Sequence, residues 1–220
     1  MKRVTIFSGH YGSGKTNVAI NYAIDLQKKG CEVSIADLDI VNPYFRTKDS
    51  EALFKDNGIE LIALPFANTS VDLPSLPSQA YGLFDRKEKK VIIDLGGDDR
   101  GALALGRFVP RILEENDYEM VFTVNFYRPL TTTVEEAYEV FREIEYASRL
   151  KFTKIVNNSN LGEQTKAEDV LKTVELTKEL SKLTGVECMF TAVNENVFKE
   201  VEGKLGEGKV FPMILQEKLF

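Results

Sequence analysis

The sequence predicts an α/β protein with a mainly parallel sheet, and two patterns support this prediction. Short apolar runs of strand length alternate with longer segments in which apolar residues recur at helical spacing, as a sheet with crossover helices requires. No internal repeat or low-complexity linker interrupts the series. We therefore expect residues 1–220 to form one three-layer domain with a doubly wound sheet.

The individual elements follow from apolar runs and helix-end signals. The predicted strands cover 4–7, 33–36, 59–64, 91–95, 120–124 and 154–156. The predicted helices cover 15–29, 102–115, 133–150 and 167–183. Pro110 should bend or break the second helix because proline lacks a backbone N–H. The proline-rich stretch 64–77 is interpreted as an ordered loop rather than a domain boundary.

Composition and charge narrow the classes of function. Hydrophobic residues make up 43% of the chain, charged residues 28%, and the net charge is −6, which disfavours nucleic acid or an anionic membrane as a partner. Cys31 and Cys188 lack metal-ligand spacing and form no disulfide framework. The apolar run at the N-terminus is too short for an export segment, and no run approaches a spanning helix. We expect a cytoplasmic protein.

The strongest signal is Gly9-His10-Tyr11-Gly12-Ser13-Gly14-Lys15-Thr16, which matches G-x-x-x-x-G-K-[ST] between a predicted strand and a predicted helix. The glycines let several N–H groups face one anion, and the helix adds its positive end. Lys15 can reach the β- and γ-phosphates, and the Thr16 hydroxyl can bind Mg²⁺. The predicted nucleotide contacts are Gly9, Gly12, Ser13, Gly14, Lys15, Thr16 and Asn17.

Acidic residues follow two of the predicted strands. Asp94 ends the strand at 91–95 and precedes Gly96 and Gly97. Asp37 and Asp39 end the second strand, where a period of two would point both to one face. Carboxylates at the carboxyl ends of parallel strands lie where open α/β sheets bind ligands. We expect them to bind metal or orient water; the alternative for Asp37 and Asp39 is a solvated turn.

The phosphate loop, the Asp-x-Asp after the second strand and the Asp94-Leu95-Gly96-Gly97 run together resemble the MinD/ParA class of P-loop ATPases, also described as the CobQ/CobB/MinD/ParA nucleotide-binding domain. The resemblance covers residues 4 to about 158 and is specific at these three motifs. It implies ATP and Mg²⁺ as ligands. It also implies a role for each matching residue: phosphate and Mg²⁺ binding for Lys15 and Thr16, water activation for Asp39, the metal's water shell for Asp37, water-mediated Mg²⁺ contact for Asp94, and the adenine edge for Asn157 or Asn158.

One position departs from that class. Its signature lysine, which reaches the partner's nucleotide across a dimer, is replaced here by His10, and Tyr11 follows where glycine is usual. His10 could make the same contact when protonated, or it could simply cap its own loop. A nucleotide-dependent homodimer therefore stays an open alternative. Arg46, Arg100 and Arg128 are candidates to compensate, each with a plain surface role as the alternative.

The sequence says less about which base the nucleotide carries and about the function that nucleotide binding serves. The chain has Asn157-Asn158-Ser159-Asn160 rather than Asn-Lys-x-Asp, so the aspartate that grips guanine is missing, and ATP is predicted over GTP. The main hypothesis is a slow ATPase that acts as a switch for an unidentified protein partner, with 42–46 and 96–100 responding to the γ-phosphate. The alternative is an ATP-dependent synthase or ligase of the cobyric acid or dethiobiotin synthetase type, with 65–77 lining a carboxylate pocket. A metal-centre assembly factor would need a Cys-x-x-Cys, which the chain lacks. The apolar tail 210–220 is expected to dock on its own domain rather than on lipid.

Overall fold

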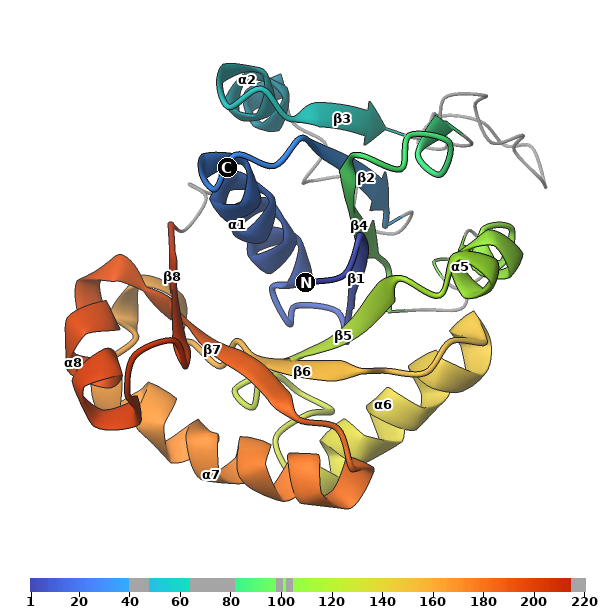
Figure 1. Cartoon of the computed structure of the whole chain (residues 1–220). Helices are drawn as coiled ribbons and strands as arrows, with labels where there is room; N and C mark the ends of the chain where they lie inside the picture. The colour runs from blue at the N-terminus through green and yellow to red at the C-terminus, as the bar shows by residue number, and fades with distance from the viewer. Residues whose placement is uncertain (40–47, 64–81, 98–100, 102–104, 215–220) are drawn as a thin grey trace.

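The computed structural model describes residues 1–39, 48–63, 82–97, 101 and 105–214. Within these residues, eight strands form one sheet in the order β3-β2-β4-β1-β5-β6-β7-β8. Every neighbouring pair is parallel (Figure 1). The strands are β1 Val4–Ser8, β2 Val33–Leu38, β3 Glu60–Ala63, β4 Lys90–Leu95, β5 Tyr118–Val124, β6 Lys154–Asn157, β7 Cys188–Asn194 and β8 Val210–Met213.

The central strand β1 lies between β4 and β5 and is fully buried. Phe7 is in register with Asp94 of β4, and Ser8 with Phe122 of β5. From β1 the chain builds toward β2 and β3 on one side and toward β5 to β8 on the other. Such a change of direction opens a crevice at the carboxyl ends of the strands, where ligands bind in doubly wound sheets. The chain leaves β1 at this crevice.

Helices cover both faces of the sheet, which gives the three layers predicted from the sequence. The helices are α1 Lys15–Lys28, α2 Lys48–Asp56, α5 Val109–Glu115, α6 Val134–Ser148, α7 Ala167–Thr184 and α8 Glu195–Leu205, with a short 3-10 turn η3 Gly162–Gln164. One apolar core joins α1 and Phe54 of α2 to one sheet face, and a second joins α5 and α6 to the other. Both faces are buried, so the strands read as continuous apolar runs rather than alternating ones.

Most predicted elements are confirmed, with boundary shifts of a few residues. Within the described ranges, the elements that were not predicted are α2, β7, η3, α8 and β8. The predicted helix 102–115 is broken just before Pro110: residues 105–106 are helical, 107–108 form a turn, and α5 begins at Val109 with Pro110 in its first turn. A missing N–H costs nothing in a first turn, so the proline stands where a new helix starts. Residues 102–104 of the predicted helix lie outside the described residues, as does the stretch 64–77.

The helix α6 shows how a local signal fixes an element boundary. Its N-cap is Thr133, whose hydroxyl accepts a hydrogen bond from the Glu136 N–H at 3.2 Å. The Glu136 carboxylate in turn accepts from the Thr133 N–H at 3.3 Å. This reciprocal capping box satisfies backbone groups that a helix start leaves without partners.

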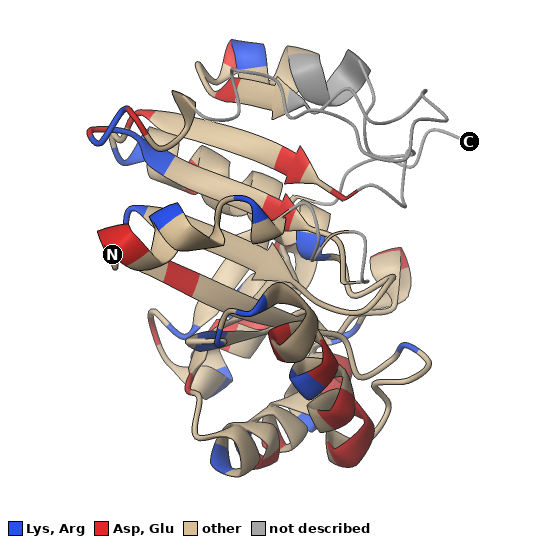
Figure 2. Ribbon diagram, turned by 90° about the vertical axis from the view of Figure 1, so that its right-hand side faces the viewer, with Lys and Arg blue, Asp and Glu red and all other residues tan. Residues whose placement is uncertain are grey.

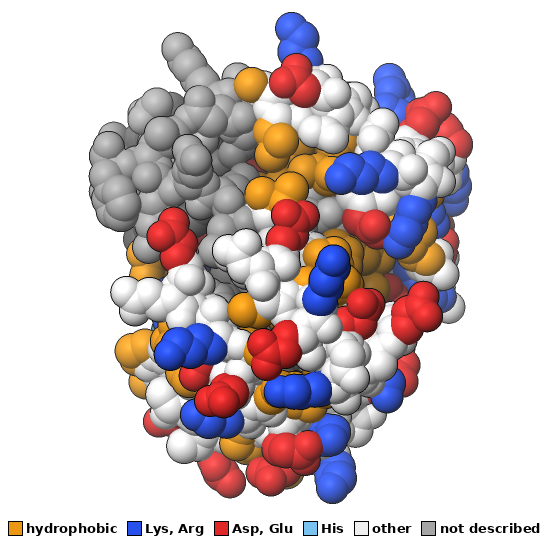
Figure 3. All heavy atoms as spheres, turned by 90° about the vertical axis from the view of Figure 1, so that its left-hand side faces the viewer, with side chains coloured by type: hydrophobic (Ala, Val, Ile, Leu, Met, Phe, Trp, Pro, Cys, Tyr) orange, Lys and Arg blue, Asp and Glu red, His pale blue; other side chains and the backbone are white. Residues whose placement is uncertain are grey.

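The described chain ends one residue after the edge strand β8, at Ile214, whose backbone N–H and carbonyl each form a hydrogen bond with the Asn21 side chain of α1. Pro212 fits this edge because edge strands tolerate a missing donor; residues 215–220 of the predicted tail lie outside the described residues. No described helix is both long and apolar enough to cross a membrane. On the face shown in Figure 3, described Lys and Arg side chains alternate with Asp and Glu.

Candidate nucleotide-binding site

The phosphate loop joins β1 to α1 at the crevice and has the backbone that its sequence demands. Gly12 and Gly14 have φ values of 79° and 81°, in the left-handed region that glycine tolerates best. Inside the loop, the Ser13 N–H donates to the His10 carbonyl at 3.0 Å. Gly14 is the N-cap of α1, and no side chain caps the helix start. The first N–H groups of a 14-residue helix are therefore directed at this loop, as an anion site requires.

Close packing of backbone around the loop leaves no room for a side chain at Gly9 or at the neighbouring Gly97. A Cβ on Gly9 would lie 2.2 Å from the Thr123 carbonyl oxygen. A Cβ on Gly97 would lie 2.1 Å from the Gly9 carbonyl oxygen, so the segment after β4 touches the phosphate loop directly. An approach of this backbone to a γ-phosphate, for which the two glycines Gly96 and Gly97 leave room, stays a prediction.

Lys15 is buried beside the loop and makes an ion pair with Asp39. Its Nζ lies 2.6 Å from Asp39 Oδ2, and the two side chains are only 6% and 7% exposed. Burial by itself would lower the pKa of Lys15, but the negative charges of Asp94, Asp39 and Asp37 outweigh it and raise the pKa above its usual value. Lys15 is therefore firmly cationic and is held beside the loop by the Asp39 carboxylate.

Thr16 and Asp94 form the second pair of the site. The Thr16 hydroxyl donates to Asp94 Oδ2 at 2.6 Å, while Asp94 Oδ1 is buried and has no hydrogen-bond partner among the described residues. Burial raises the pKa of Asp94 to about 7, with the Lys15 charge opposing the shift and the Asp37 charge adding to it. A buried carboxylate with an unsatisfied oxygen beside a hydroxyl is a donor set suited to a hard cation.

Asp37 lies next to this pair and orients Asp39. Its Cα is in register with that of Asp94 on the neighbouring strand. Figure 2 shows acidic residues, in red, at the tips of strand arrows. Asp37 Oδ1 accepts the Asp39 N–H at 2.9 Å. Among the described residues no three acidic, histidine or cysteine side chains converge as a ready metal cage. Mg²⁺ characteristically uses one or two protein oxygens together with substrate phosphates and water, so Thr16 and Asp94 fit that ion.

The two asparagines expected at the adenine edge are engaged inside the domain. Asn157 is fully buried; its amide donates to Thr173 Oγ1 at 3.0 Å and accepts from the Ser159 N–H at 3.1 Å. Asn158 Nδ2 donates to the Ser13 carbonyl at 2.8 Å and would be 2.3 Å from a Cβ on Gly14. Both side chains position the loops of the site here, and their contact with a base stays a prediction.

Two further asparagines follow strands or the phosphate loop, and the sequence predicted a role for Asn17 but not for Asn125. Asn17, predicted to contact nucleotide, lies in the first turn of α1, where its carbonyl accepts from Asn21 at 2.9 Å. Asn125 was not predicted, yet its Oδ1 accepts the Tyr127 N–H at 3.0 Å and the Asn160 N–H at 3.4 Å. It links the loops after β5 and β6, and its place directly after a strand was the available signal.

Four residues were considered as substitutes for the missing signature lysine, and two of them, His10 and Arg128, lie among the described residues. His10 Nδ1 donates to the Tyr11 carbonyl at 3.0 Å, so the imidazole bonds within its own loop. Arg128 lies across Gly12, since a Cβ there would be 3.6 Å from Arg128 Cδ. Arg46 and Arg100 lie outside the described residues.

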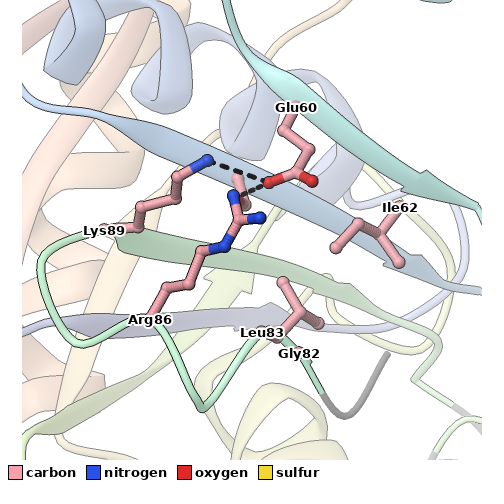
Figure 4. Close-up of a pocket in the computed structure, with 7 residues that line it drawn as sticks. Glu60, Ile62, Gly82, Leu83, Arg86 and Lys89 are labelled. Atoms are coloured by element: carbon pink, nitrogen blue, oxygen red, sulfur yellow. Dashed lines mark hydrogen bonds and ion pairs between the residues drawn. The ribbon is translucent and has the colours of Figure 1, made fainter. Parts of the chain in front are cut away.

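A separate cavity of about 150 Å³ lies at the opposite, amino-terminal end of β2 and β3 (Figure 4). Its polar wall is Glu60, whose carboxylate accepts from Ser34 at 2.9 Å and from Lys89 at 3.1 Å. These two partners lower the pKa of Glu60. The cavity contains no part of the phosphate loop, so the chemistry of the motif is not located there.

Comparison with known proteins identifies the fold. No protein-family model matches the chain, and no curated protein matches it in sequence. Among solved structures, FtsY of Thermotoga maritima superposes with a TM-score of 0.62 at 16% identity, over 88% of this chain and 62% of that one. Chloroplast FtsY of Physcomitrella patens gives 0.60 at 16% identity, over 87% and 58%.

The signal recognition particle 54 kDa protein of Aeropyrum pernix, in complex with GDP, gives a TM-score of 0.54 at 14% identity, over 86% of this chain and 41% of that one. The chain thus spans about three fifths or less of the length of these neighbours. At such identities the likeness establishes the fold alone, an α/β domain with a parallel sheet and helices around it.

Proposed function

We propose that this protein binds ATP with Mg²⁺ at the phosphate loop and acts as a slow, nucleotide-dependent switch of the MinD/ParA type. The observation that carries the proposal is the buried Lys15–Asp39 ion pair at the start of an uncapped helix. A buried lysine held by a carboxylate at an anion-binding helix end can exchange that carboxylate for a phosphate without leaving its place.

Each residue then has a role that its contacts support. The helix N-terminus and the loop N–H groups would bind phosphate oxygens, and Lys15 would turn from Asp39 to the β- and γ-phosphates. Thr16 and Asp94 would hold Mg²⁺, which when bound neutralises phosphate charge. Asp39, once Lys15 has turned to the phosphates, would place its carboxylate beside them. There it can orient a water and accept its proton as the water attacks the γ-phosphorus and ADP leaves.

ATP rather than GTP is proposed as the nucleotide because the loop after β6 offers amides instead of a carboxylate. Guanine recognition needs an acceptor for two N–H groups, which a carboxylate supplies best. Two solved neighbours are GDP complexes, so the choice needs direct comparison. A competition titration should show ATP displacing labelled nucleotide at lower concentration than GTP, and equal displacement would contradict it.

The second candidate is the ATP-dependent ligase, and one observation favours it. His10 is bonded to its own loop instead of being extended toward a partner, so a sandwich dimer lacks its usual trans cation. In a ligase the γ-phosphate would pass to a small carboxylate, giving an acyl phosphate and ADP, and no dimer is needed.

Light scattering on the Asp39→Ala protein separates the two candidates, because this variant should retain ATP without consuming it. A dimer with MgATP and a monomer with MgADP would support the switch. A monomer with both nucleotides would contradict the switch and favour the ligase, which a screen of small carboxylates for substrate-dependent ADP release would then test.

A further inference from the structure

We propose that Arg128 binds the terminal phosphate of the nucleotide from within the same chain and thereby makes the site distinguish ATP from ADP. This inference rests on the proposed function, since it concerns the same nucleotide. It assigns the cation that the loop lacks at His10 to a residue on a different segment.

The first support is position. Arg128 follows β5, the strand that pairs directly with β1, so the two loops leave the sheet side by side. The Arg128 side chain lies over the phosphate loop, with Cδ and Nε 3.6 and 3.7 Å from where a Cβ on Gly12 would be. Glycine at this position leaves the guanidinium room to lie against the loop.

The second support is the absence of a competing partner. Arg128 is exposed, and no carboxylate in the described residues pairs with it. Lys15, by contrast, is held by Asp39 at 2.6 Å. An arginine without a carboxylate beside an anion-binding loop can offer two parallel N–H groups to phosphate oxygens.

The third support is the rigidity of the segment that carries Arg128. Its N–H donates to the Asn125 carbonyl at 3.1 Å, and its carbonyl accepts the Thr131 N–H at 3.2 Å. The Thr131 hydroxyl donates to the Asn125 carbonyl at 2.7 Å, and the Tyr127 hydroxyl reaches the Asp169 carbonyl at 2.9 Å. Leu130 has a φ of 64°, a strained value for a branched residue that persists only where surrounding contacts enforce it. The backbone is therefore fixed, and the side chain alone has to move.

The terminal phosphate is the expected target because the loop N–H groups at the start of α1 would serve the α- and β-phosphates. Lys15 would be shared between the β- and γ-phosphates, so the γ-phosphate has room for a second cation. Arg128 lies over Gly12, two residues before the Gly14 N-cap of α1, and we infer that the outermost phosphate of a triphosphate held at the helix start extends toward it. ADP lacks that group, so the contribution of Arg128 should appear with ATP alone.

The test is a calorimetric titration of MgATP and MgADP into wild type, Arg128→Ala and Arg128→Gln. Arg142→Ala is the matched control, because Arg142 is an exposed arginine on α6 whose described contact is the Tyr138 hydroxyl. Both Arg128 variants should bind ATP about tenfold or more weakly, the scale of one lost charge-assisted contact. Their ADP affinity should stay within about twofold, and Arg142→Ala should match wild type for both nucleotides.

An ATP-to-ADP affinity ratio that is unchanged in folded Arg128 variants would overturn the inference while leaving the proposed function intact. This holds even if both affinities fall equally, because Arg128 would then act on the loop and not on the terminal phosphate. Failure of the wild type to bind either nucleotide would refute the proposed function, and this inference with it.

Discussion

Two buried cations, Arg3 and Lys15, lie at opposite ends of β1, and each is 5% exposed. Arg3 is fully satisfied: it pairs with Glu115 through Nε and Nη2, and its Nη1 donates to three carbonyls in the segment before β4. Its guanidinium also lies 5.9 Å from the Phe84 ring centroid. Lys15 has one described hydrogen bond, to Asp39.

The contrast separates a structural charge from a functional one. Arg3 has a fixed set of partners that join β1, α5 and the turn before β4, so any movement would break several bonds at once. Lys15 lies among three carboxylates, one of which, Asp94, keeps an oxygen without a hydrogen-bond partner among the described residues. Arg3 should therefore contribute to stability and Lys15 to ligand binding, and the following variants test that division.

The largest stability effect is expected for Arg3→Met. This change leaves the Glu115 carboxylate, 12% exposed, without its partner, and should lower the free energy of unfolding by about 3–5 kcal/mol. Urea unfolding measures it. The control is Arg111→Met, whose pair with Asp85 is exposed and should cost less than about 1 kcal/mol. An equal loss of unfolding free energy in the two variants would contradict the structural role of Arg3. Weaker ATP binding by the folded Arg3 variant would contradict the separation of a structural cation from a ligand-binding one.

Asp39→Ala should slow ATP hydrolysis by about 10²-fold or more, the scale of a lost general base. ATP affinity should be retained or increased, because Lys15 loses the carboxylate that competes with phosphate. Steady-state phosphate release and a binding titration measure the two quantities. Unchanged turnover would place the catalytic role on another residue or show that hydrolysis is not the function.

The smallest effect concerns Asp94 and depends on pH. Its pKa is raised to about 7, from an ordinary value of 3.8. Between these values the folded protein binds more protons than the unfolded chain, so Asp94 makes stability fall as pH rises through that window. Asp94→Asn removes this loss, so in EDTA the variant should melt at a higher temperature than wild type at pH 8, by roughly 2–4 °C per kcal/mol recovered. The difference should shrink toward pH 5. A difference in melting temperature that stays constant with pH would show that the ionisation of buried Asp94 is not its cause.

The sequence predicted the central half of the fold well because its strands are continuous apolar runs bounded by strong turn signals. It missed β7 and α8, although Asn194 caps α8 and its apolar Val197, Phe198, Val201 and Leu205 recur at helical spacing. β8 was missed for a physical reason: a four-residue edge strand containing Pro212 has no pattern distinguishable from a loop.

The predictions for the site also fall into two groups, those that depend on neighbouring residues and those that depend on distant ones. Local spacing predicted the phosphate loop and the strand-end aspartates, because both follow from consecutive residues. The ion pair of Lys15 with Asp39, the bond from Asn158 to Ser13 and the approach of Arg128 to Gly12 join residues from 24 to 145 positions apart or on different loops. Such contacts are set by strand order, which the sequence pattern does not specify.

The most direct test of the central claim is a calorimetric titration of MgATP into the wild-type protein and into Lys15→Ala. The account predicts saturable binding at one site by the wild type and none detectable by the variant, with circular dichroism showing both to be folded. Saturable binding of equal affinity by folded Lys15→Ala would contradict the account, because the phosphate would then not depend on the one lysine that the loop supplies.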